Sequence, residues 1–173
     1  MNSLANSMLL NICIRQADIN EYQTLTAISF AAKRHWNYPE EYYGQWKEEL
    51  TITEDYIRKN LVYVAVYKDE IIGFYSIVEN LQDFWTGKVF VSKGFWLEHI
   101  FIKPEYHGLR VGRQLMEHTM QIALAKEIET LWIFVDPYAK GFYDKIGATF
   151  VRESPSSIEG RMIPVYELSI KGR

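Results

Sequence analysis

Cysteine is almost absent from this chain of 173 residues, which contains Cys13 and no other cysteine. A single cysteine excludes an intramolecular disulfide, and it cannot make a zinc site alone. Such cysteine usage fits a protein of the reducing cytoplasm, and we expect no metal site.

Long hydrophobic runs and a strong charge of one sign are also missing. No window reaches the roughly 18 apolar residues that a membrane span needs, and residues 1–10 lack the basic segment of a signal peptide. The net charge is −3, without a long cluster of Lys or Arg, which disfavours nucleic acid as the main partner. We therefore expect a soluble protein that acts on neither membranes nor nucleic acid.

What the chain does contain is an ordinary globular composition that is rich in aromatic side chains. Apolar residues make up 48% and aromatic residues 15% of the sequence. The length suffices for one domain with a proper core. Because no internal repeat or low-complexity tract occurs, residues 1–173 are predicted to form a single domain, with residues 1–10 as a loose lead-in.

The first half of the chain predicts helices followed by a β-hairpin. Asp18 is a typical N-cap residue, and apolar residues recur after it at close to helical spacing. Pro39 lies just inside a second helical segment, and Thr53 begins a shorter one. The expected ranges are a strand at 11–15, helices at 19–32, 39–50 and 53–59, strands at 61–67 and 71–78, and an extra hairpin within 80–94.

The second half predicts a strand at 95–102, a loop at 103–111 and an amphipathic helix that ends near residue 126. A buried strand follows at 131–135, and then a short helix that stops at Gly147. Two further strands, at 150–153 and 165–170, end the pattern. This order predicts an α/β (α+β) fold: a mixed, mostly antiparallel sheet with one central βαβ crossover, flanked by helices.

The loop that leads into the helix is the most informative feature of the sequence. An apolar strand ends at Ile102, Lys-Pro-Glu breaks it, and a loop that contains Gly and Arg feeds the helix. Free N–H groups at a helix N-terminus, beside Arg110 and Arg113, suit an anion and especially a phosphate. The loop is no Walker motif and no dinucleotide fingerprint, because it has neither GK[ST] nor G-x-G-x-x-G.

Glu98 is conspicuous because it is a carboxylate within an apolar strand. With regular alternation it shares a face with Trp96 and Ile100, while His99 points to the opposite face with Phe101. A carboxylate in such a run needs a partner or a purpose. A structural ion pair with Lys or Arg of a neighbouring strand is one reading, and His99 is interpreted as a satisfied core or surface histidine.

A second motif follows the predicted crossover: Asp136-x-x-Ala139-x-x-x-Tyr143-x-x-x-Gly147. Together with the loop, it resembles the GNAT superfamily of N-acetyltransferases. Those proteins carry Gln/Arg-x-x-Gly-x-Gly/Ala after their fourth strand and Asn-x-x-Ala-x-x-x-Tyr-x-x-x-Gly-Phe further on. The resemblance covers residues 12–170 in element order and about 95–150 in its motifs.

The loop and the second motif depart from the family pattern at four positions. His107 stands where the family usually has Gln or Arg, and Arg110 stands where it usually has Gly. Asp136 replaces Asn, and Ala148 replaces Phe. Arg110 is the departure of most consequence, because its Cβ would crowd the backbone against a phosphate.

The resemblance implies that coenzyme A binds along the fourth strand and the loop. Its pyrophosphate would lie on backbone amides from His107 to Arg113, and its pantetheine arm would pair like an extra strand with Ile100 to Ile102. The strands at 95–102 and 131–135 would splay into a groove that opens toward residue 107. The implied cofactor-binding residues are Ile100, Phe101, Ile102, His107, Gly108, Leu109, Arg110, Val111, Gly112, Arg113, Asp136, Ala139 and Tyr143.

The resemblance also implies two catalytic residues. Glu98, or a water that it orders, would take a proton from the acceptor amine, with its pKa raised by partial burial. Tyr143 would protonate the leaving thiolate, the alternative being a core tyrosine. A backbone N–H near Phe101 would stabilise the oxyanion. Asp136 would turn the chain and touch the cofactor, the alternative being the turn alone.

The sequence gives little information about the acceptor amine. Aromatic and acidic residues crowd the segment that forms a wall of the acceptor pocket in the family, although packing and a solvated charged face explain such residues equally well. These residues are Trp36, Tyr38, Glu40, Glu41, Tyr42, Tyr43, Trp46, Glu48 and Glu49.

The leading functional hypothesis is a cytoplasmic, acetyl-CoA-dependent N-acetyltransferase without a metal, acting on an amine of a small molecule or peptide. A homodimer is left open. One alternative is a non-catalytic module of the same fold that binds or senses acyl-CoA. Another is a pure interaction domain, which predicts no coenzyme A binding.

Overall fold

A seven-stranded sheet organises the chain, and the computed structural model describes residues 9–171 of it. The strand order is β1-β2-β3-β6-β7-β9-β8, and all neighbours are antiparallel except β6 and β7. These two are parallel and are joined through α5, which confirms the predicted central crossover in a mostly antiparallel sheet. The strands are β1 (Cys13–Gln16), β2 (Leu61–Tyr67), β3 (Glu70–Asn80), β6 (Gly94–Ile102), β7 (Thr130–Phe134), β8 (Thr149–Pro155) and β9 (Met162–Ser169).

The helices begin where the sequence provides caps. Asp18 accepts a hydrogen bond from the N–H of Asn20 and forms a capping box with Glu21, after which α1 follows. Thr53 caps α4 by accepting from the N–H of Tyr56. The helices are α1 (Tyr22–Arg34), α2 (Glu40–Gln45), α3 (Lys47–Leu50), α4 (Glu54–Lys59), α5 (Val111–Ala125) and α6 (Lys140–Lys145).

The segment predicted as one helix over 39–50 consists of two short helices. Pro39 is the N-cap of α2 rather than a residue inside it, and the chain turns at Trp46 before α3. Trp46 is 2% exposed and packs in one cluster with Leu50 and Ile158. The turn lets both Trp46 and Leu50 reach this cluster, so burial of the two side chains overrides helix continuity.

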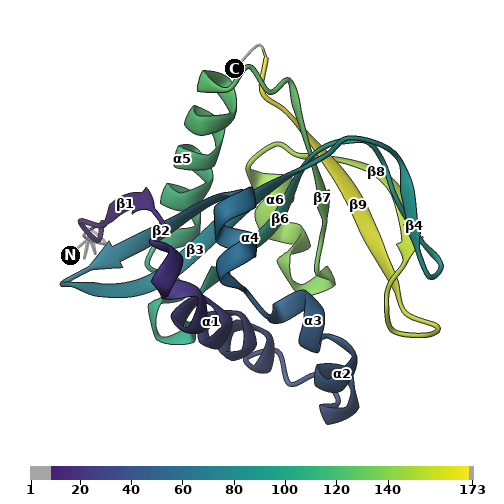
Figure 1. Ribbon diagram of the computed structural model, residues 1–173, viewed down its shortest axis with the longest axis horizontal. Coiled ribbons are helices and arrows are strands. Elements are labelled where there is room, and N and C mark those ends of the chain that lie inside the picture. The colour runs from purple at the N-terminus through teal and green to yellow at the C-terminus, as the bar shows by residue number, and fades with distance from the viewer. Residues whose placement is uncertain (1–8, 172–173) are drawn as a thin grey trace, which may run out of the picture.

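Helices lie on both faces of the sheet (Figure 1). One cluster joins α1 and α4 to Phe74 of β3, and the other joins α5 and α6 to Tyr75 of the same strand. Consecutive strand residues point to opposite faces, so β3 contributes to both clusters, and Phe74 and Tyr75 are each 0% exposed. The sheet is therefore the middle layer of three.

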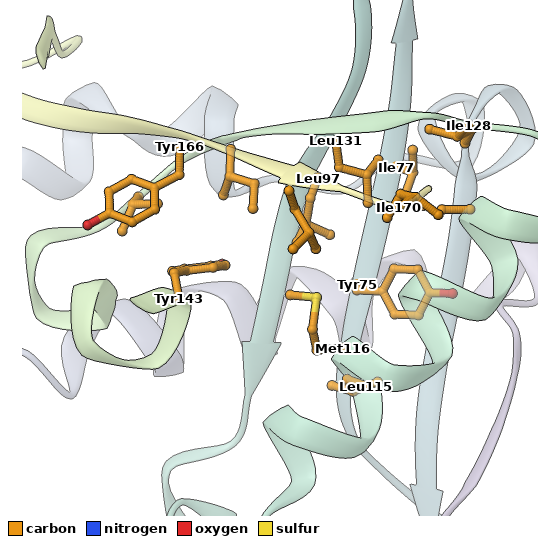
Figure 2. Packing of buried hydrophobic residues seen from close by; sticks show 14 of the residues in the cluster. Tyr75, Ile77, Leu97, Leu115, Met116, Ile128, Leu131, Tyr143, Tyr166 and Ile170 are labelled. Atoms are coloured by element: carbon orange, nitrogen blue, oxygen red, sulfur yellow. The ribbon is translucent and has the colours of Figure 1, made fainter. Parts of the chain in front are cut away.

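The larger cluster lies between the sheet and α5 (Figure 2). Met116 of α5 packs there with Leu97 and Leu131, which come from the two parallel strands. Leu10 packs at its margin, and its carbonyl accepts a hydrogen bond from Nε2 of Gln114 at 3.2 Å. The prediction of a loose lead-in is therefore wrong for residue 10, and residues 1–8 lie outside the described part of the chain.

We expect Leu115→Ala to destabilise the protein strongly, because this side chain is 0% exposed in the α5 cluster. Truncation of a buried leucine typically costs about 2–5 kcal/mol. Leu124→Ala on the same helix is the matched control, since Leu124 is 64% exposed. Urea unfolding of both variants measures the difference, and equal losses would contradict the assigned core.

The two parallel strands pair only at their beginning. Phe95 lies opposite Leu131 and Trp96 opposite Trp132, and no further pairs between β6 and β7 occur in the described chain. Beyond residue 96, β6 is hydrogen-bonded to β3 on one side and separates from β7 on the other. The predicted splay between the two strands is thus confirmed.

A small hairpin follows β3, as predicted for residues 80–94. It consists of β4 (Phe84–Thr86) and β5 (Val89–Val91). A guanidinium nitrogen of Arg152 on β8 donates to the carbonyl of Phe90 at 3.4 Å, which ties the hairpin to the far edge of the sheet. Val91 of the hairpin also packs in one cluster with Trp96 and Trp132, where β6 and β7 still pair.

Candidate active site

A cavity of about 650 Å³ lies where β6 and β7 separate. Its walls come from α1, α3, α4, the β4–β5 hairpin, β6, α5, α6 and the segment between β8 and β9. The site residues predicted from the sequence that line it are Glu98, Ile100, Phe101, Ile102, His107, Gly112, Asp136, Ala139 and Tyr143. The others, which lie in the loop and first turn of α5 without lining the cavity, are Gly108, Leu109, Arg110, Val111 and Arg113.

The free edge of β6 presents backbone groups to this cavity. Lys103 donates its N–H to the carbonyl of Ile72 at 2.8 Å, so Ile102 opposite Gly73 occupies a non-hydrogen-bonded position of the β3–β6 ladder. Hydrogen-bonded and non-hydrogen-bonded positions alternate along a strand, so Ile100 also occupies a non-hydrogen-bonded position. The N–H and C=O groups of Ile100 and Ile102 therefore point away from β3. Phe101 lies between them and its N–H faces β3. Near Phe101, the N–H groups that are not used in the β3–β6 ladder are therefore those of Ile100 and Ile102, and not that of Phe101 itself.

His107 occupies part of that edge. Its Nε2 donates to the carbonyl of Ile102 at 3.0 Å, and its ring packs edge-on against His35 with centroids 4.8 Å apart. Trp36 lies parallel to the same ring at 6.3 Å. The side chain that replaces Gln or Arg of the family pattern thus closes one end of the cavity.

The N-terminus of α5 carries no side-chain cap. The first N–H groups of a helix have no partner within the helix, and here the preceding residue, Arg110, leaves them uncovered. Arg110 is in the left-handed conformation with φ +61°, which an L-residue rarely adopts and glycine adopts freely. The arginine therefore keeps the backbone path that a glycine would follow.

The two arginines of this region differ in their partners. The side chain of Arg110 is exposed and forms no hydrogen bond or ion pair with the residues that the structure describes. Arg113 is also exposed and pairs with Glu117 one turn further along α5, with Nε at 3.0 Å from Oε1. An anion at the helix start would find the Arg110 guanidinium uncommitted.

Gly112 marks the closest approach of α5 to the site. A Cβ built on it would lie 3.1 Å from Cδ1 of Ile102 and 3.5 Å from the ring of Phe142. A side chain at this position would press the helix start away from the end of β6. The glycine therefore holds the uncapped helix start against the free strand edge.

Glu98 lies on a β-bulge, which corrects its expected surroundings. Ser76 pairs with His99, and Ile77 pairs with Leu97, so Glu98 is the extra residue between them. The bulge breaks the alternation. Leu97 packs with the α5 cluster, whereas Phe101 packs with the α1 cluster, and Glu98 no longer shares a face with Ile100. The Glu98 side chain is 47% exposed.

His99 does not point away from Glu98, as alternation would require. Tyr56 of α4 donates a hydrogen bond from its hydroxyl to Oε2 of Glu98, and the same hydroxyl lies 3.0 Å from Nδ1 of His99. Ser76 contributes a third hydroxyl contact to this group. His99 itself is 7% exposed and fully hydrogen-bonded, which confirms the interpretation of a satisfied core histidine.

Tyr143 is the second predicted catalytic residue, and its hydroxyl opens to the cavity. The side chain is 5% exposed and lines the cavity wall. In the described chain, every side-chain oxygen that the protein encloses fully has a hydrogen-bond partner, whereas the Tyr143 hydroxyl has none. This hydroxyl is therefore not fully enclosed, and it reaches the cavity that Tyr143 lines. Burial, and then the charge of Asp136, raise the pKa of Tyr143 well above its usual value. The phenol is therefore protonated and able to donate.

Asp136 is held by other protein groups. Its carboxylate accepts from Nζ of Lys33 at 2.6 Å and from the hydroxyl of Tyr38 at 2.7 Å, and a nitrogen of Arg161 lies 3.8 Å away. Burial alone would raise the pKa of Asp136, but Lys33 and the hydrogen bonds outweigh it and lower the pKa. The N–H of Tyr138 also bonds to this carboxylate, as expected for the turn that follows β7. These contacts join α1 and the β8–β9 segment to the end of β7.

The predicted aromatic wall is only partly on the cavity. Trp36 and Trp46 line it, as do Glu48 and Glu49. The remaining aromatic and acidic residues of that segment do not line it: Tyr38, Glu40, Glu41, Tyr42 and Tyr43. Tyr43 is a core residue with 6% exposure, which fits the packing alternative.

Several cavity residues were not predicted from the sequence. The β4–β5 hairpin supplies Phe84, Thr86, Val89 and Val91, and these carry no chemical signature. Tyr56 likewise has no local signal, because only the tertiary contact brings α4 to β6. Ser76 does not line the cavity but bonds to Tyr56 and His99, and it could have been found, since it is a hydroxyl in the otherwise apolar run of β3.

Within residues 9–171, no three His, Cys, Asp or Glu side chains are arranged so that they could hold a metal ion. None of the helices in this part of the chain is long and apolar enough to cross a membrane.

Comparisons with known proteins agree with this geometry. The model of the acetyltransferase (GNAT) family matches residues 26–148. Peptidyl-lysine N-acetyltransferase YjaB of Escherichia coli is 27% identical over 150 residues, which cover 84% of this chain and 98% of the relative. The 5-NmdU N-acetyltransferase of Pseudomonas phage PaMx11 is 25% identical over 143 residues, covering 83% of this chain and 91% of the phage protein.

Solved structures share the fold. A GCN5-related N-acetyltransferase from Rhodopseudomonas palustris superposes with a TM-score of 0.71 at 19% identity, covering 91% of this chain and 94% of that chain. PaiA N-acetyltransferase from Thermoplasma acidophilum, solved in complex with coenzyme A, gives a TM-score of 0.70 at 20% identity, with coverages of 92% and 99%.

Proposed function

Because the chain belongs to the GNAT family of acetyltransferases, we propose that it transfers an acetyl group from acetyl-CoA to a primary amine of a small molecule or peptide. One observation carries the proposal. A free strand edge, an uncapped helix start, a carboxylate and a protonated phenol surround a single cavity. The two relatives are named for different acceptors, so the family leaves the amine open.

The cofactor would bind along the splay. The N–H groups at the start of α5 would receive the pyrophosphate, with the Arg110 guanidinium beside them. The C=O group of Ile100 and the N–H of Ile102 would pair with the amide-bearing arm, as an added strand does. Gly112 supports this placement, because it keeps the helix start close to the end of β6.

The chemistry assigns one role to each group around the cavity. Glu98 takes a proton from the acceptor ammonium, and the free amine attacks the thioester carbonyl, forming the C–N bond. The N–H of Ile100 donates to the oxygen on which charge develops. Tyr143 donates its proton to sulfur as the C–S bond breaks. The nitrogen releases its second proton to solvent as the amide forms, the phenolate regains one proton from solvent, and the proton on Glu98 is released.

The acceptor would enter between the α1–α3 region and the β4–β5 hairpin. That side combines Trp36 and Trp46 with the carboxylates of Glu48 and Glu49. Lys33 and Arg161 also line it, but both contact Asp136.

The proposal is tested with purified protein, acetyl-CoA and a panel of spermidine, an aminoglycoside and a lysine-containing peptide, monitored for thiol release. If acetyl-CoA binds but none of the amines leads to thiol release, the proposed acetyltransferase activity is contradicted.

One observation favours a second candidate, a module that binds acyl-CoA without catalysis. The hydrogen bond from His107 occupies the carbonyl of Ile102, so this group of the free strand edge is not available to the cofactor arm. A thermal-shift comparison of acetyl-CoA, coenzyme A and buffer reports binding, because a ligand of the native state raises Tm. A shift without thiol release identifies the sensor, and no shift with either ligand identifies an interaction domain.

Charge reversal at the helix start should weaken cofactor binding. We expect Arg110→Glu to raise the Kd for acetyl-CoA roughly tenfold, since the guanidinium has no competing partner and would face the pyrophosphate. The affinity should also depend less on salt, because one attractive charge is lost. Calorimetric titration at two salt concentrations measures both effects.

Two variants control this experiment. Arg110→Gly removes the charge and suits the φ of +61°, so it should bind more weakly than the parent but more tightly than Arg110→Glu. Lys126→Glu makes the same change of net charge at the opposite end of α5 and should leave Kd unchanged. Equal affinities in Arg110→Glu and the parent protein would move the pyrophosphate elsewhere.

A further inference from the structure

We infer that Tyr56 is a positioning residue, whose hydroxyl fixes the carboxylate of Glu98 in the orientation that accepts the amine proton. The inference rests on the base role proposed for Glu98. Tyr56 comes from α4, lines the cavity and bonds to Oε2 of Glu98. No motif of the sequence points to this residue.

The hydrogen-bond network around Tyr56 has a fixed direction. Nε2 of His99 donates to the carbonyl of Glu49 at 2.8 Å, so Nδ1 of the neutral ring is an acceptor. Tyr56 gives its only proton to Glu98, because a carboxylate cannot donate. The proton that Nδ1 requires must then come from the hydroxyl of Ser76, which lies 2.9 Å away.

This direction makes Glu98 the end of the network. The hydroxyl oxygen of Tyr56 lies 2.8 Å from that of Ser76 and 3.0 Å from Nδ1 of His99, and it is held beneath the bulge. Burial, and then the charge and hydrogen bond of Glu98, raise the pKa of Tyr56, which keeps the hydroxyl a donor. A partly buried donor thus points at a carboxylate on the cavity wall.

Glu98 needs such a donor because its own surroundings do not fix it. It is the unpaired residue of a bulge, its side chain is 47% exposed, and no lysine or arginine of the described chain pairs with it. An exposed glutamate samples several rotamers, and each misplaced rotamer lowers the fraction that can accept the proton. A displacement of about 1 Å in a reacting group can cost on the order of a hundredfold in rate.

Tyr56→Phe tests the inference because it removes only the hydroxyl. Ser76 and His99 remain hydrogen-bonded to each other, so no buried polar group of the network is left unpaired. Tyr75→Phe is the matched control. Tyr75 is buried, and its hydroxyl lies 2.9 Å from Nδ1 of His118. Neither Tyr75 nor His118 lines the cavity. Both variants should unfold close to the parental Tm.

The kinetic arm uses whichever amine of the three-amine panel is acetylated. We expect Tyr56→Phe to lower kcat roughly ten- to a hundredfold, with little change in KM for acetyl-CoA, and Tyr75→Phe to leave both unchanged. In the Glu98→Gln background, Tyr56→Phe should cause no further loss, because its effect passes through Glu98. An equal loss in both backgrounds would show a structural role and overturn the inference.

The structural arm does not depend on turnover. Crystal structures of the parent and of Tyr56→Phe should show one ordered carboxylate of Glu98 in the parent and several conformers in the variant. An unchanged, ordered Glu98 in the variant overturns the inference even if no amine is acetylated. If Glu98→Gln is fully active, Glu98 is not the base. A disordered Glu98 in Tyr56→Phe would then show only that Tyr56 fixes the position of this carboxylate.

Discussion

Glu98→Gln should lower kcat by about 10²–10⁴-fold, the usual loss when a general acid or base is removed. Glutamine keeps the length and the hydrogen bond with Tyr56, since its amide oxygen accepts as the carboxylate does. The substitution removes the ability to take a proton. Affinity for acetyl-CoA should remain nearly intact, because the proposed cofactor contacts lie at residues 100–113.

The measurement is steady-state thiol release across pH, with calorimetric titration of acetyl-CoA. Glu79→Gln serves as the control, since Glu79 is an exposed carboxylate on the neighbouring strand that does not line the cavity. Near-parental rates of Glu98→Gln at every pH would move the base to an ordered water or to a residue outside β6. Glu98 would then be a structural carboxylate.

Tyr143→Phe should reduce kcat by roughly 10²-fold or more, because the variant cannot protonate the leaving thiolate. The ring stays in the α5 cluster, so packing is preserved, and the lost hydroxyl bonds to no other described residue. The unfolding free energy should therefore change little. Tyr166→Phe is the matched control: its buried ring carries a hydroxyl that donates to Asp144 at 2.9 Å, outside the cavity lining.

The pH dependence of this variant follows from the direction of the pKa shift. A phenol donates only while it is protonated, that is, below its pKa. Because burial and then Asp136 raise the pKa of Tyr143, the donor form persists well above pH 10, the ordinary pKa of tyrosine. The parent and Tyr143→Phe should thus show parallel rate profiles up to that pH. If the activity of the parent protein fell as the pH rose through neutrality, and that of Tyr143→Phe did not, a raised pKa of Tyr143 would be contradicted.

The sequence predicted the elements that depend on local patterns. Caps at Asp18 and Thr53, period-two strands and the crossover through α5 all appear where expected. The segment at 39–50 was predicted less well, because burial of Trp46 and Leu50 divides it. Spacing within the loop and the second motif also indicated the family, which its family model confirms over residues 26–148.

The site required the tertiary structure wherever partners come from distant segments. The bulge at Glu98 depends on the register between β3 and β6, and a one-residue slip reverses which face each side chain occupies. Asp136 looked like a cofactor contact, but Lys33 and Tyr38 hold its carboxylate. Neither fact is visible in a local pattern.

The sequence by itself therefore determined the order of helices and strands, the family and some of the residues around the cavity, because spacing and caps act over a few residues. Only the tertiary structure decided how those residues are used. It left the edge of β6 free beyond Trp96, turned the N–H groups of Ile100 and Ile102 away from β3, and brought Tyr56 to Glu98. Strand register and helix docking result from packing of the whole core, and a reading of neighbouring residues cannot supply them.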